Sequence, residues 1–191
     1  MIGILLAAGF SRRFGENNKL LHPLADGRPM GLAAAQNLIQ AMPTAIAIVR
    51  PENHVLAELL MATGLQVFSC GALEREMADS LAAAVRYSSA FAAADEGLLI
   101  ALADMPFIRP ATILAVANAL TSGAPIVVPT YQSQRGHPVG FAAKFRDELE
   151  SLQGDEGARS ILKRHASEVY TLACDDPGIV ADIDTLSDLK A

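Results

Sequence analysis

Short apolar segments of strand length alternate with longer helical segments along most of the chain. This alternation predicts an α/β protein with a mostly parallel sheet. Wholly apolar segments such as 97–102 agree, because parallel sheets are covered on both faces. The expected strands are 2–7, 45–49, 65–69, 97–102, 126–129, 138–141, 169–173 and 179–183. The expected helices are 30–41, 54–63, 80–94 (capped by Asp79 or Ser80), 112–121, 144–152 and 158–165, with a helical turn at 185–189.

Length and composition narrow the class of protein. The 191 residues suit a single domain, 1–191, and a hydrophobic fraction of 51% argues against disorder. A net charge of -6 argues against a nucleic-acid partner. Cys70 and Cys174 form no metal-binding spacing, which favours a reducing, cytoplasmic location. The first apolar segment has no basic residues before it, unlike a secretion signal, and no apolar window is long enough to cross a membrane.

Polar clusters follow three of the expected strands. They are the segment 9–19, Asp104 with Pro106, and the pair Asp182 and Asp184. Ligands of open α/β sheets bind beyond the carboxyl ends of the strands, so the shared position of these clusters predicts one binding site. The less regular stretch 130–157 is expected to form an insertion over this edge of the sheet.

The first cluster has the composition of an anion-binding turn. Small residues at 7–9 allow backbone amides to approach phosphate oxygens, and Arg12, Arg13 and Lys19 add charged donors. The segment matches neither the dinucleotide-binding nor the P-loop pattern, which disfavours a Rossmann oxidoreductase and a P-loop ATPase. The alternative is a solvated turn with surface arginines.

The acidic clusters have the composition of a magnesium site. Asp104 ends a buried strand opposite the cationic loop, where a carboxylate can hold magnesium against phosphates. It could instead be a turn or helix-capping residue, although Pro110 better marks the next helix start. On a strand, Asp182 and Asp184 would share one face, and either could supply a second carboxylate. Alternatively, Asp184 or Thr185 caps the last helical turn.

These motifs, taken in order, resemble the molybdenum cofactor nucleotidyltransferases, a MocA/MobA-like NTP transferase family, and its cytidylyltransferase branch in particular. The resemblance covers essentially the whole chain. It is carried by Leu6-Ala7-Ala8-Gly9, Ser11-Arg12-Arg13-Phe14-Gly15, Lys19, Asp104-Met105-Pro106, Gly136-His137-Pro138 with Phe141, Gly154-Asp155-Glu156-Gly157-Ala158-Arg159, and Asp182-Ile183-Asp184-Thr185.

The resemblance implies a fold and a set of site residues. The fold would be a Rossmann-like, three-layer α/β/α arrangement with a mixed, mainly parallel sheet, as in nucleotide-diphospho-sugar transferases. Mg²⁺ would bind Asp104 and Asp184, and Arg13, Lys19 and Asp104 would be catalytic. The nucleotide would contact Leu6, Ala7, Ala8, Gly9, Ser11, Arg12, Arg13, Lys19, Ser80 and Asp104. The acceptor would contact Arg135, His137, Asp155 and Arg159, although a histidine before a proline is usually structural.

The implied reaction is transfer of CMP from CTP to the phosphate of molybdopterin, with release of pyrophosphate. Ala8 favours cytosine over guanine, because guanylyltransferase relatives usually carry glycine there. A client molybdoenzyme or its chaperone is the expected protein partner. The alternatives are a guanylyltransferase, a sugar- or alcohol-phosphate nucleotidyltransferase, and a non-catalytic nucleotide- or cofactor-binding protein.

Overall fold

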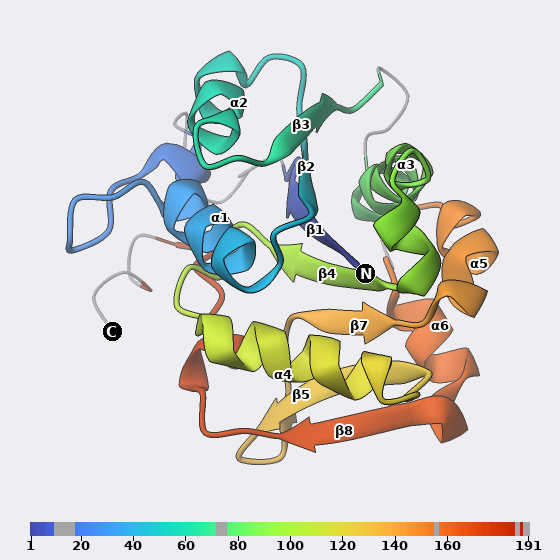
Figure 1. The fold of residues 1–191 in the computed structure, drawn as a ribbon. Coiled ribbons are helices and arrows are strands. Elements are labelled where there is room, and N and C mark those ends of the chain that lie inside the picture. The colour runs from blue at the N-terminus through green and yellow to red at the C-terminus, as the bar shows by residue number, and fades with distance from the viewer. Residues whose placement is uncertain (10–17, 72–75, 155–156, 186–187, 189–191) are drawn as a thin grey trace.

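One mixed sheet of eight strands organises the protein (Figure 1). The computed structural model describes residues 1–9, 18–71, 76–154, 157–185 and 188. The strand order is β3-β2-β1-β4-β7-β5-β6, and β8 pairs with the other edge of β5. The strands are β1 (Ile2–Ala7), β2 (Ala45–Val49), β3 (Gln66–Ser69), β4 (Leu98–Leu102), β5 (Ile126–Tyr131), β6 (Gln134–Arg135), β7 (Val139–Phe141) and β8 (Val169–Ala173).

The N-terminal half of the sheet is parallel. β1 pairs in parallel with both β2 and β4, and β3 continues this arrangement at one edge. β7 is antiparallel to its neighbours β4 and β5, whereas β8 is again parallel to β5. The mixed, mainly parallel sheet predicted from the sequence is therefore confirmed.

Helices cover both faces of the sheet and complete three layers. α1 (Met30–Ala41), α2 (His54–Met61) and α4 (Pro110–Thr121) bury apolar side chains against one face. α3 (Met77–Ser88), α5 (Arg146–Glu150) and α6 (Arg159–Arg164) cover the other. Short 3-10 helices connect these elements: η1 (Lys19–Leu21), η2 (Ala92–Glu96), η3 (Ala143–Phe145), η4 (Ala166–Glu168) and η5 (Pro177–Val180).

Local sequence signals explain several helix boundaries. Pro110 occupies the first turn of α4, where its missing N–H costs nothing. Gly64 adopts φ +97° shortly after α2, as a helix-terminating glycine does. These helices, and every other expected element not discussed below, end within two residues of the predicted bounds.

The expected helix 80–94 is two separate elements. α3 begins at Met77, and the Asp79 carboxylate accepts the Glu76 backbone N–H at 3.0 Å. Asp79 thus lies inside the first turn, and neither it nor Ser80 is the cap. The helix ends at Ser88 and η2 follows. The expected helix 144–152 is likewise shorter, with η3 leading into α5.

The stretch 130–157 is not an insertion over the sheet. β7 lies inside the sheet, with Ile100 opposite Val139 and Val127 opposite Gly140. β6 was not predicted, because its hairpin turn at Gln132 and Ser133 uses positive φ angles of 47° and 67° without glycine or asparagine. The usual sequence signal for a tight turn is therefore missing.

The predicted strand 179–183 is wrong. η5 occupies Pro177–Val180, and Pro177 has no N–H with which to enter a strand ladder. The Asp176 carboxylate instead accepts the Gly178 N–H at 3.0 Å and starts the 3-10 turn. The expected helical turn at 185–189 lies largely outside the described residues. None of the described helices is both long and apolar enough to cross a bilayer.

Candidate functional site

The Lys19 ammonium links the three chain segments that were predicted to form the site. It donates to Asp104 Oδ2 at 2.7 Å, to Asp184 Oδ1 at 3.1 Å and to the Ile183 carbonyl at 3.2 Å. The Lys19 side chain is only 11% exposed. The prediction that these clusters meet at the carboxyl edge of the sheet is confirmed for the residues that the structure describes.

β1 and β4 bring Asp104 to this edge. The two strands are in register as neighbours, and the Ala103 N–H donates to the Leu6 carbonyl at 3.1 Å just beyond the ladder. Asp104, which follows β4, and the turn 7–9, which follows β1, therefore lie at the same edge of the sheet. α4 begins six residues later at Pro110, so Asp104 is not its cap.

The turn after β1 leaves open space at the site. Ala7 and Ala8 are buried, on opposite faces of the sheet. Gly9 is exposed, and a Cβ atom added there would have no neighbour within 4 Å among the described residues. Packing against those residues does not require a glycine at this position.

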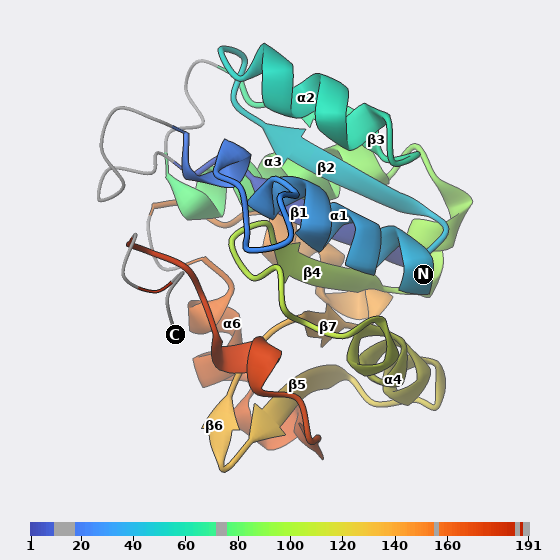
Figure 2. The same cartoon turned by 90° about the vertical axis from the view of Figure 1, so that its left-hand side faces the viewer.

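A strap formed by residues 176–184 follows β8 (Figure 2), and its last residue, Asp184, lies beside Lys19. Asp176, 2% exposed, anchors its start: the carboxylate accepts the Thr112 hydroxyl at 2.6 Å and the Arg109 N–H at 2.9 Å. Near its end, the Ile183 N–H donates to the Asp104 carbonyl at 3.0 Å. The role of Asp176 was not predicted, although the order aspartate, proline, glycine is a known signal for a helix start.

Two glycines allow the strap to approach its neighbours closely. A Cβ atom on Gly136 would lie 2.7 Å from the carbonyl carbon of Ile179 and closer still to its oxygen. A Cβ atom on Gly178 would overlap the Phe107 carbonyl in the same way. The His137 N–H donates to the Ile179 carbonyl at 2.9 Å, beside a cis His137–Pro138 bond. The glycine of Gly-His-Pro thus has a packing role.

The electrostatics of the site favour a protonated lysine. Burial lowers the pKa of Lys19, but the neighbouring carboxylates outweigh burial, Asp104 most strongly, and raise the pKa above its usual value. The ammonium therefore keeps its charge at neutral pH.

The oxygens around Lys19 match the preferences of a divalent metal. Two carboxylate oxygens and one backbone carbonyl oxygen converge on a single cation, and such hard oxygen donors suit magnesium or manganese. Within the described ranges no set of three His, Cys, Asp or Glu side chains gathers to hold a metal, so the two carboxylates beside Lys19 would need further ligands from the nucleotide or from water. Asp182 is exposed, and in the described part of the chain no hydrogen bond or ion pair joins its side chain to Lys19, so Asp184 is the better second carboxylate.

The residues predicted to hold an acceptor are only partly brought together. Burial lowers the pKa of His137, against the attraction of Asp104, and Arg159 lowers it further. His137 thus lies within electrostatic reach of both residues and is neutral at pH 7. Its buried Nδ1 has no hydrogen-bond partner among the described residues. Arg135 is exposed on β6, and no hydrogen bond or ion pair links its side chain to His137 in the described part of the chain.

Ser80, predicted to contact the nucleoside, faces inward in this structure. It is 4% exposed, and its hydroxyl donates to the Glu76 carbonyl at 3.1 Å. Ser11, Arg12, Arg13 and Asp155 lie outside the described residues.

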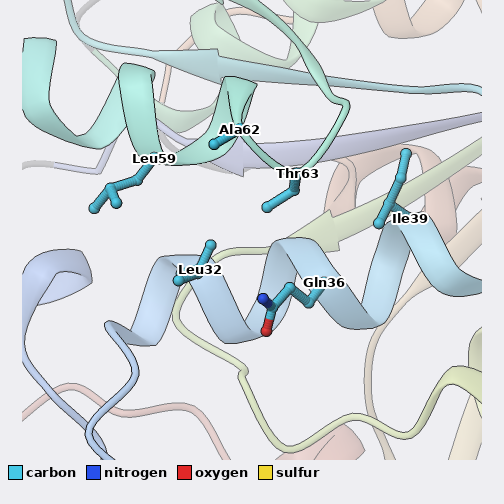
Figure 3. A pocket seen from close by; sticks show the side chains of 6 residues that line it. All are labelled: Leu32, Gln36, Ile39, Leu59, Ala62 and Thr63. Atoms are coloured by element: carbon cyan, nitrogen blue, oxygen red, sulfur yellow. The ribbon is translucent and has the colours of Figure 1, made fainter.

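A groove between α1 and α2 lies apart from these residues (Figure 3). Its polar groups are engaged within the protein, because Gln36 accepts a hydrogen bond from Arg28 and Thr63 donates to the Leu60 carbonyl. None of the predicted site residues lines it. The lining residues are Leu32, Gln36, Ile39, Leu59, Ala62 and Thr63.

The sequence of residues 3–169 matches the family model described as the MobA-like NTP transferase domain. The chain belongs to this family. The MocA/MobA-like resemblance inferred from the motifs is thereby confirmed, and the chain is a nucleotidyltransferase by family and fold.

Individual relatives agree with this assignment. The chain is 29% identical over 196 residues to the purine catabolism protein PucB of Bacillus subtilis, covering 97% of this chain and 92% of PucB. The crystal structure of Rv0371c from Mycobacterium tuberculosis superposes with a TM-score of 0.81 at 26% identity, covering 99% of this chain and 94% of Rv0371c. A second structure of Rv0371c is a complex with manganese. Mth528, a nucleotidyl transferase from Methanothermobacter, has the same fold, with a TM-score of 0.81 at 20% identity, covering 98% of this chain and 93% of Mth528.

Proposed function

We propose that this protein transfers CMP from CTP to the terminal phosphate of molybdopterin, with or without bound molybdenum, and releases pyrophosphate. The observation that carries the proposal is the convergence of Lys19, Asp104 and Asp184 beside the open turn after β1. A nucleotidyltransferase needs cations around a triphosphate and carboxylates for a metal, and one such cation, Lys19, lies with two such carboxylates at this edge.

The reaction joins two anions and needs no strong base. An oxygen of the acceptor phosphate forms a bond to the α-phosphorus of CTP, and the bond between that phosphorus and the bridging oxygen of pyrophosphate breaks. A phosphate monoester has a second pKa of about 6, so it attacks mainly as a dianion at neutral pH. The absence of a nucleophile–base pair among the proposed catalytic residues, Arg13, Lys19 and Asp104, fits this chemistry.

The side chains of this chain would supply electrostatic stabilisation. Arg12, Arg13 and Lys19 would bind the phosphates, with the backbone at 6–9 beneath them. Asp104 and Asp184 would hold Mg²⁺, which would neutralise phosphate charge and orient the triphosphate. Their exposures of 24% and 31% leave both carboxylates accessible from the solvent side.

The acceptor would bind beside the strap. His137 lies within electrostatic reach of Asp104 and Arg159, and its Nδ1, which has no partner among the described residues, could bond to a polar ligand. Arg135 and Asp155 complete the proposed acceptor set on the strength of the resemblance alone. For Ser80 to reach a nucleoside, its hydroxyl would have to leave the Glu76 carbonyl.

Pyrophosphate release with molybdopterin and each of the four NTPs tests the function. We expect release with CTP that depends on both molybdopterin and magnesium. Release with a sugar phosphate in place of molybdopterin would identify a different nucleotidyltransferase. Binding of NTP without release for any acceptor would support a non-catalytic nucleotide-binding protein.

Base preference is tested separately at Ala8. Its methyl group is buried in the same cluster as Cys70 and Leu81, on the α3 side of the sheet, where the nucleoside is expected. We expect the unmodified protein to prefer CTP over GTP by roughly tenfold to a hundredfold in direct competition, because a methyl group in a stiff turn excludes the larger base. In Ala8→Gly the preference for CTP over GTP should be smaller.

If the preference for CTP over GTP is unchanged in Ala8→Gly, other residues select the base. A preference for GTP in the unmodified protein would refute the cytidylyltransferase proposal and leave the nucleotidyltransferase assignment intact.

A further inference from the structure

In this structure a lysine occupies the position expected for the metal. The Lys19 ammonium contacts both proposed metal-binding carboxylates and the Ile183 carbonyl, with distances of 2.7 to 3.2 Å. A metal ion bound to the same oxygens would bring a second cation into contact with the ammonium, where the two charges repel strongly. Lys19 and a metal therefore compete for Asp104 and Asp184.

The backbone around Lys19 is well anchored, so the side chain is the part that can move. The Asn18 carboxamide accepts the Leu20 N–H at 3.0 Å, and the His22 N–H donates to the Lys19 carbonyl at 3.1 Å. Leu20 is buried beneath α1, where a Cβ atom on Gly31 would contact it. A lysine side chain has four rotatable bonds and can change partner while its backbone stays in place.

A displaced ammonium needs a new anionic partner. Leaving it inside the protein without one would carry a large desolvation cost. The triphosphate proposed to bind beside the turn 7–9 is such a partner, and the metal would bridge the same phosphates.

We propose that Lys19 is a resident cation that a divalent metal displaces from Asp104 and Asp184, and that the NTP triphosphate receives the displaced ammonium, so that metal and nucleotide bind cooperatively. This inference rests on the proposed function for the identity of the nucleotide. Because coupling between two ligands is reciprocal, each ligand strengthens binding of the other by the same factor. Metal alone should bind weakly.

Manganese binding without nucleotide tests whether Lys19 and the metal compete for the two carboxylates. Free Mn²⁺ is measured by electron paramagnetic resonance during titration of the unmodified protein, Lys19→Met and Lys19→Arg, with exposed Lys163→Met as the matched control. We expect Lys19→Met to bind Mn²⁺ roughly tenfold to a hundredfold more tightly, the factor that hydrogen bonds to a charged group represent. Lys19→Arg and Lys163→Met should bind as weakly as the unmodified protein.

The cooperative binding of metal and nucleotide is tested by repeating the titrations with CTP. The Mn²⁺ that CTP itself binds is measured in a protein-free titration and subtracted. CTP should strengthen Mn²⁺ binding to the unmodified protein by a larger factor than to Lys19→Met. Circular dichroism melts check that each variant is folded, and Lys19→Gln replaces Lys19→Met if the latter is not.

Equal Mn²⁺ affinity in the unmodified protein and the neutral Lys19 variants would overturn the inference, and so would a lack of Mn²⁺ binding in all of them. If CTP strengthens Mn²⁺ binding equally in the unmodified protein and in Lys19→Met, the proposed coupling through Lys19 is overturned. Tighter Mn²⁺ binding in Lys19→Met together with no pyrophosphate release from any NTP would refute the proposed function and support the displacement.

Discussion

Asp104→Asn is expected to slow nucleotidyl transfer by about a hundredfold to a thousandfold, the usual effect of removing one preorganised charged group from a site of this kind. Asparagine keeps the size of the side chain and removes the charge that would hold the metal. Steady-state pyrophosphate release at saturating CTP, acceptor and magnesium is the measurement.

Stability should change far less than activity. Asparagine ends the 2.7 Å ion pair with Lys19, but Asp184 and the Ile183 carbonyl still accept from the ammonium. We expect the free energy of unfolding to fall by about 1 kcal/mol, the size of one hydrogen bond. Asp182→Asn is the matched control: it removes a nearby exposed carboxylate and should leave the transfer rate nearly unchanged. Near-normal turnover of Asp104→Asn at saturating magnesium would remove Asp104 from the proposed role.

Gly136→Ala is expected to lower the free energy of unfolding by about 3 kcal/mol or more, because the new methyl group overlaps backbone atoms instead of a flexible side chain. To relieve the overlap, the strap must move away from β6, which strains the hydrogen bond from the His137 N–H to the Ile179 carbonyl. Urea denaturation, with the slope checked for constancy, measures the loss.

Gly9→Ala adds the same methyl group into open space and serves as the control for packing. Its free energy of unfolding should stay within about 0.5 kcal/mol of the unmodified protein, as for surface changes in general. If Gly136→Ala is as stable as Gly9→Ala, the strap is not packed against Gly136 as described.

Most of the fold was predicted correctly because the apolar pattern of most segments agrees with the strand or helix that they form. The apolar segment at 2–7 and the helix at 30–41 have the observed bounds of β1 and α1. The errors fall where short-range signals compete. Apolar residues at 179–183 suggested a strand, but Pro177 and the Asp176 carboxylate favour a 3-10 turn.

The convergence of the candidate site residues was predicted from the sequence only in part. That Lys19 and Asp104 share the carboxyl edge follows from the alternation of strands and helices, whereas Asp184 reaches this edge on the strap and not at the end of a strand. That Lys19 contacts both carboxylates depends on the path of the strap. This path is determined by contacts between residues far apart in the chain, such as Asp176 with Thr112, which no local pattern encodes.

The separation of Lys19 and Asp184 by 165 positions also bears on how the protein is made. The ribosome delivers the N-terminal portion first, and it can begin to fold as it emerges. β1, β2 and β4 can pair, and Lys19 can meet Asp104, well before the strap has been synthesised. The second carboxylate and the Ile183 carbonyl are added only after β5, β7 and β8 have been synthesised. A partly synthesised chain can therefore pair most of the sheet with only one of the two carboxylates beside Lys19, and the proposed site is complete only when the strap docks.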